Sequence, residues 1–85
     1  MLELQFSSQA RDFLKKIESS LWARIINRIE KLRSEPFPKD TKRVKGIREK
    51  TFRIRVGDYR ILYMVYPERN LLFISKVEKR ARVYD

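Results

Sequence analysis

Residues 51–66, TFRIRVGDYRILYMVY, alternate apolar and polar side chains on both sides of a Gly-Asp pair. Alternation with a period of two is typical of a half-buried strand. A two-residue loop that begins with glycine favours a type II′ hairpin, and such a turn fixes the register of its strands. The expected cross-strand pairs are Val56 with Tyr59, Arg55 with Arg60, and Ile54 with Ile61. We therefore expect the fold to be built around an antiparallel hairpin.

The two faces of this hairpin differ in chemistry. Arg53, Arg55 and Arg60 share one face. Like charges directly opposite each other weaken a hairpin by about a few tenths of a kcal/mol, so folding alone does not explain the Arg55/Arg60 pair. The pattern predicts an anionic ligand on this face. The other face is apolar and large enough to pack against helices; its residues are Phe52, Ile54, Val56, Tyr59, Ile61, Tyr63 and Val65.

The segment before the hairpin predicts a strand and a pair of helices. A short strand is expected where Leu2, Leu4 and Phe6 alternate with polar residues. Ser7 or Ser8 then caps a first helix. The apolar positions of that helix have helical spacing and are Ala10, Phe13, Leu14 and Ile17.

A second helix follows after a short break at Ser19-Ser20. Ser20 is expected to cap it, and it ends before Pro36. Its apolar stripe, in which we interpret Trp22 as a core residue, consists of Leu21, Trp22, Ile25, Ile26, Ile29 and Leu32. Because the break is short, we expect an antiparallel helix pair stacked on one face of the sheet.

The remaining segments are a loop and a last strand. Residues 35–50 read as a loop with a short extended piece at 44–47, where Val44 and Ile47 tuck under the sheet. Residues 67–70 predict a turn and 71–79 a long strand. We expect its helix-facing residues to be Leu71, Phe73, Ser75 and Val77, and Lys76, Glu78 and Arg80 to lie on the side of the hairpin arginines. The fold class is thus α+β: an N-terminal strand, an antiparallel helix pair and a three-stranded antiparallel sheet, in a single domain over residues 1–85.

The charge of the chain predicts a polyanionic partner. Lys and Arg number 21 against 11 Asp and Glu, a net charge of +10. Residues 39–60 alone hold nine basic and three acidic side chains. Such an excess favours nucleic acid or an acidic protein. No segment approaches the roughly 20 apolar residues that span a bilayer, and the N-terminal residues lack the pattern of a signal peptide, so we expect a cytoplasmic protein.

The residue types exclude several classes of enzyme. The chain has no His and no Cys, so zinc hydrolysis and thiol catalysis lack their ligands and nucleophile. Asp58 lies in a turn, and Glu49 and Glu78 are separate, whereas two-metal phosphodiester cleavage needs convergent carboxylates. We expect no metal and no cofactor.

RNA scission by the neighbouring 2′-hydroxyl suits the remaining residue types, because it needs no external nucleophile. Arginines can align the phosphate and neutralise its developing charge. Arginine is a poor proton carrier, since its pKa exceeds about 12. Tyr84 and Lys79 are left to move protons.

The segments GIREKTFRIRVGDYRILYMVY and VEKRARVYD resemble the RelE/ParE superfamily of bacterial and archaeal toxins. The resemblance covers nearly the whole chain, and the strand, helix-pair and three-strand order matches the fold of that superfamily. It implies a RelE-like activity: cleavage of messenger RNA in the ribosomal decoding site through metal-free 2′-hydroxyl attack.

The resemblance also implies roles for individual residues. Arg53 and Arg55 occupy strand positions that are basic in RelE-like toxins. Arg60 matches a phosphate-binding arginine, Arg80 an arginine at the end of the last strand, and Tyr84 a near-terminal tyrosine that stacks on or helps activate the nucleotide. Lys79 stands where many relatives carry the His of a G-H-R sequence, which removes the usual titrating group. Independently of the resemblance, the positive charge predicts nonspecific phosphate attraction by the loop cations. The full set of expected RNA-binding residues is Lys42, Arg43, Lys45, Arg48, Lys50, Lys79 and Arg82.

We therefore expect the toxin of a type II toxin–antitoxin system, a ribosome-dependent endoribonuclease. Its partners would be the ribosome with messenger RNA and a RelB-like acidic antitoxin, which forms a hetero-oligomer with it. Fold does not decide function, so two alternatives stay open. One is a ParE-like poison of DNA gyrase that cuts nothing, and the other is a basic RNA-binding module without activity.

Overall fold

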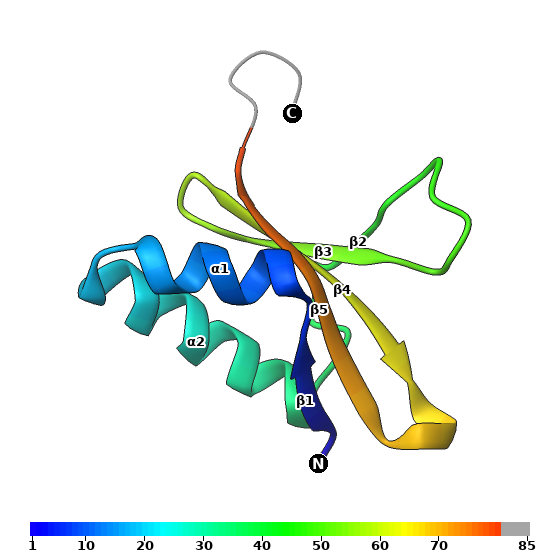
Figure 1. Ribbon diagram of the computed structural model, residues 1–85. Helices are drawn as coiled ribbons and strands as arrows, with labels where there is room; N and C mark the ends of the chain where they lie inside the picture. The colour runs from blue at the N-terminus through cyan, green and yellow to red at the C-terminus, as the bar shows by residue number, and fades with distance from the viewer. Residues whose placement is uncertain (81–85) are drawn as a thin grey trace.

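Helices and strands form two layers in the computed structural model, which describes residues 1–80 (Figure 1). The sheet is five-stranded, with the order β1-β5-β4-β3-β2. Its strands are β1 (Glu3–Phe6), β2 (Lys42–Arg43), β3 (Phe52–Val56), β4 (Tyr59–Tyr66) and β5 (Leu71–Lys79). Strands β3, β4 and β5 form the expected antiparallel sheet. Two edge strands extend it: β1 pairs with β5 in parallel, and β2 pairs with β3.

The helix pair covers one face of this sheet, as expected (Figure 1). Helix α1 (Ser8–Lys16) has Ser7 as its N-cap, and the Ser7 hydroxyl accepts a hydrogen bond from the amide of Ala10. Helix α2 (Ser19–Ser34) begins two residues earlier than expected. Its N-cap is Glu18, so the prediction of Ser20 as the cap was wrong. The Ser20 hydroxyl lies inside the first turn and donates to the Glu18 carboxylate instead.

The core lies between the two layers. Helix α2 contributes Ile25, Ile29 and Leu32 to the core, and all three are fully or almost fully buried. Trp22 is 45% exposed, so its interpretation as a core residue was wrong. It lies in the first turn of α2, and the buried stripe begins one turn later. The sheet contributes Ile54, Val56, Ile61, Tyr63, Leu72, Ile74 and Val77.

A β-bulge in β5 changes which of its residues face the helices. Leu62 pairs with Lys76, but Tyr63 pairs with Ile74, so Ser75 is an extra residue in the ladder. Before the bulge, Leu72 and Ile74 are buried. The prediction that Leu71, Phe73 and Ser75 face the helices was therefore wrong, because it continued the regular alternation through this point. Beyond the bulge the prediction holds: Val77 is buried, and Lys76 and Glu78 share the open face with the arginines.

The loop before the hairpin also differs from expectation. Its extended piece is β2 at Lys42–Arg43 rather than 44–47, since the ladder with β3 starts there. Val44 is half-buried and its amide donates to the carbonyl of Thr51. Ile47 is 39% exposed and does not tuck under the sheet. Among the described residues, no helix is both long and apolar enough to cross a membrane.

Candidate nucleic-acid interface

The register of the β3–β4 hairpin places the three arginines on the face that the helices leave open. Val56 pairs with Tyr59, Arg55 with Arg60, and Ile54 with Ile61, which confirms the three expected pairs. Gly57 has φ +57°, a value that a glycine in the first turn position adopts without strain. Because paired residues point to the same side, Arg55 and Arg60 are neighbours across the hairpin.

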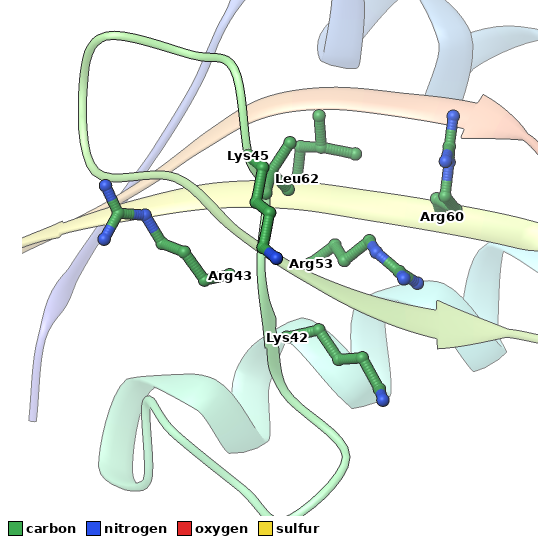
Figure 2. A pocket seen from close by; sticks show the side chains of 7 residues that line it. Lys42, Arg43, Lys45, Arg53, Arg60 and Leu62 are labelled. Atoms are coloured by element: carbon green, nitrogen blue, oxygen red, sulfur yellow. The ribbon is translucent and has the colours of Figure 1, made fainter.

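Basic side chains surround a pocket of about 390 Å³ at the β2 end of this face. Arg53 of β3 and Arg60 of β4 both line it. Figure 2 shows the Arg53 and Lys42 side chains extending in a similar direction, with Lys45 near Arg53, whereas the Arg60 side chain extends away from these three. A smaller pocket of about 190 Å³ adjoins it, because Lys42 and Arg53 line both. The larger pocket is lined by Lys42, Arg43, Val44, Lys45, Arg53, Arg60 and Leu62, and the smaller one by Asp40, Lys42, Arg53 and Arg55.

The carboxylate of Glu78 lies among the cations of this open face. Glu78 lies directly opposite Arg60 in the β4–β5 ladder, and the two side chains form an ion pair. Lys76 approaches the other oxygen of the same carboxylate, with Nζ 3.2 Å from Oε1. The alternation of β5 placed Glu78 on the side of the hairpin arginines, as observed, but did not identify Arg60 as its partner. Its pairing depends on the register of β4 against β5, which the bulge sets, so no local pattern could reveal it.

The end of β5 lies close to the hairpin turn. The amide of Arg80 donates to the carbonyl of Asp58 at 2.6 Å. The backbone of Arg80 therefore lies at the same end of the sheet as Arg55 and Arg60. Lys79 pairs with Tyr59, whose ring contacts Phe13 of α1. The register thus places Lys79 on the helix side of the sheet, away from the arginines.

The other predicted RNA-binding residues are dispersed. Arg43 pairs with Phe52 and so lies on the helix side of the edge strand, although it also lines the larger basic pocket. Arg48 and Lys50 are exposed in the loop between β2 and β3. Arg82 and Tyr84 lie outside the described residues.

A buried tyrosine anchors the segment that leads into β2. The Tyr63 hydroxyl donates to the carbonyl of Pro36 at 2.6 Å and lies 3.2 Å from the Thr41 hydroxyl, which donates to it. Burial raises the pKa of Tyr63, so the phenol stays protonated and keeps its donor. The alternation of β4 predicts only that Tyr63 lies on the apolar face, and it contains no signal for the hydrogen bonds of the hydroxyl. The anchor fixes the position at which Lys42 enters the sheet.

The chain matches the family of ParE toxins of type II toxin–antitoxin systems over residues 4–84. It belongs to the RelE/ParE superfamily of toxins. A protein of Methanocaldococcus jannaschii that is proposed to be a toxin and called RelE1 is 34% identical over 74 residues, which are 84% of this toxin and 81% of the relative.

Solved structures of RelE proteins share the fold of this toxin. The toxin–antitoxin complex RelBE2 from Mycobacterium tuberculosis aligns with a TM-score of 0.78 at 28% identity, over 93% of this toxin and 98% of that chain. The archaeal RelE-RelB complex from Pyrococcus horikoshii aligns with a TM-score of 0.83 at 24% identity, over 96% and 98%. These likenesses confirm the fold that the sequence resemblance implied.

Proposed function

We propose that this toxin is an endoribonuclease that cleaves messenger RNA on the ribosome. The observation that carries the proposal is the basic pocket on the open face, which side chains from β2, β3 and β4 line together. A concave site with several cations suits a ribose-phosphate backbone better than a flat basic surface does, because it can surround one phosphate. The similarity to RelE proteins supports the same conclusion.

The reaction would use the substrate's own nucleophile. The 2′-oxygen of one nucleotide attacks the adjacent phosphorus and the 5′-oxygen of the next nucleotide leaves, which produces a 2′,3′-cyclic phosphate. Arg53 and Arg60 would hold the phosphate in line and neutralise the charge that builds on its oxygens. Arg55 and Arg80 would extend the positive field toward the hairpin turn, and Tyr84 would stack on or help activate the nucleotide.

An acidic antitoxin is the second proposed partner. The solved relatives include RelE-RelB complexes, and the net charge of +10 favours an acidic, RelB-like protein that covers the open face in a hetero-oligomer. Binding there would block RNA sterically. A ribosomal target would require the toxin to act in the cytoplasm.

The test of cleavage uses ribosomes programmed with a defined messenger, and primer extension locates the cut. We expect a cut in the decoding site. A messenger with a single 2′-deoxynucleotide at that position should resist, because the nucleophile is gone, while the same substitution three nucleotides downstream should not matter. Intact normal messenger on active ribosomes would refute the proposal, and equal cleavage of both deoxy messengers would refute the 2′-hydroxyl mechanism.

A gyrase poison is the second candidate function. The match to the ParE family over residues 4–84 favours it, because it covers nearly the whole chain. A supercoiling assay with purified gyrase and toxin separates the two. Inhibition of supercoiling at stoichiometric toxin, with intact messenger on ribosomes, would assign the poison.

A further inference from the structure

An apolar pocket of about 450 Å³ lies at the sheet edge beside the basic one. Arg43 lines both pockets. Figure 2 shows the Arg43 side chain extending away from Arg53 and Arg60, and its pairing with Phe52 places it on the helix side of the edge strand. The walls of this pocket are Phe37, Pro38, Thr41, Arg43 and Phe52.

Two phenyl rings form a corner in this pocket. The centroids of Phe37 and Phe52 are 4.9 Å apart and their planes meet at 66°. A flat ring that stacks on one of them presents its edge to the other, which is the favoured arrangement for aromatic groups. The Arg43 guanidinium lies 6.0 Å from the Phe52 centroid, at the limit of a cation–π contact.

The exposed ring is held in place although it lies at the surface. Phe37 is 53% exposed, yet it lies between two prolines, which restrict its backbone. The preceding carbonyl, that of Pro36, accepts the hydrogen bond from Tyr63, and the carbonyl of Pro38 accepts one from the amide of Thr41. A rigid exposed aromatic beside a cluster of cations is the arrangement with which proteins bind single-stranded nucleic acid.

We propose that the Phe37–Phe52 corner is a nucleobase subsite for single-stranded RNA. The inference rests on the proposed function and extends it. When one phosphate occupies the basic pocket, the base of a neighbouring nucleotide stacks on Phe37, and Arg43 contacts the backbone between them. An apolar side chain of a protein partner would fit the same walls, but the shared Arg43 and the adjoining Lys42 and Lys45 favour an anionic strand.

The test measures binding of a hexaribonucleotide in which 2-aminopurine occupies each position in turn. We expect the fluorescence of 2-aminopurine to be quenched at the one position of the hexamer whose base stacks on Phe37. Phe37→Ala should abolish that quench and weaken binding by about 5- to 100-fold, whereas Phe37→Tyr should keep both. Trp22→Ala is the matched control, since it removes another exposed aromatic, on α2. Melting curves report that each variant is folded.

A hexamer that is abasic at the quenched position separates stacking from a general loss of affinity. Wild type and Phe37→Ala should bind it equally. The subsite is refuted if Phe37→Ala weakens both hexamers to the same degree or weakens neither. Unchanged RNA binding with weaker binding of the antitoxin would assign the corner to a protein partner and also refute it.

Cleavage by the wild type on programmed ribosomes is measured in parallel. If the wild type cleaves messenger and Phe37→Ala binds the hexamer as tightly as the wild type does, the subsite is refuted and the nuclease is supported. A quench that depends on Phe37 without cleavage would support the subsite and refute the nuclease.

Discussion

Glu78 lowers the positive charge beside Arg60 on the open face. Its carboxylate lies between Arg60 and Lys76 and competes with any phosphate for both. We predict that Glu78→Gln strengthens RNA binding by about three- to tenfold at low salt, because it removes one nearby negative charge and keeps the shape. Filter binding of single-stranded RNA measures the change. Glu68→Gln alters the net charge equally in the turn between β4 and β5; an equal gain in that variant would contradict a local effect.

Tyr63 links core stability to the position of the basic pocket. Tyr63→Phe removes the hydrogen bond to Pro36 and should lower the free energy of unfolding by about 1–2 kcal/mol at pH 7. The folded pKa is raised, so this contribution is complete below about pH 10 and is lost as pH rises further. Urea titrations at pH 7 and near pH 11 should therefore show a smaller difference between variant and wild type at the higher pH. A constant difference would contradict the assignment.

The hairpin could be predicted from the sequence, whereas the last strand could not be predicted in full. The turn at Gly57 fixes its pairs through neighbouring residues alone. The bulge at Ser75 depends on contacts between distant segments: the Ser7 hydroxyl donates to the Ser75 carbonyl at 2.8 Å, and the Ser75 hydroxyl donates to the Leu62 carbonyl at 3.2 Å. Neither contact can be inferred from the alternation of apolar and polar residues in β5, so the position of the bulge could not be predicted.

The two adjacent serines at the start of α1, Ser7 and Ser8, are expected to differ in their contribution to stability. The Ser7 side chain caps the helix and also bonds to the bulge, while Ser8 is an exposed first residue of the helix. Ser7→Ala should lower the free energy of unfolding by about 1–2 kcal/mol, and Ser8→Ala should change it by less than about 0.5 kcal/mol. Urea denaturation measures both. Equal losses would show that the hydroxyl of Ser7 has no special role.

The candidate site likewise has one part that could be predicted from the sequence and one part that could not. The three arginines share a face because alternation and the turn place them there, so the sequence was sufficient. The pocket itself needs β2, whose two residues pair with β3 across the loop of residues 44–51. The partners of Arg60 and the corner at Phe37 also arise from tertiary contacts, which a local pattern does not contain.

At the scale of the whole molecule, the positive charge should act through one face. Each phosphate contact to single-stranded RNA contributes about 0.7 to the slope of log K against log salt concentration. Arg53→Gln should reduce that slope by about 0.7, and Lys15→Gln, in the last turn of α1, should leave it unchanged. Fluorescence anisotropy over a series of salt concentrations measures the slopes. Equal reductions would mean that binding follows net charge alone.

The proposed function predicts that the cations on the open face of the sheet, rather than the net charge of the molecule, determine the rate of RNA cleavage. Single-turnover cleavage on programmed ribosomes compares two double variants of equal charge, Arg53→Ala with Arg60→Ala and Lys15→Ala with Lys16→Ala on α1. The first should cut at least about 100-fold more slowly than the wild type, and the second at nearly its rate. Equal rates in the two double variants would show that the arginines of the sheet do not carry out the cleavage.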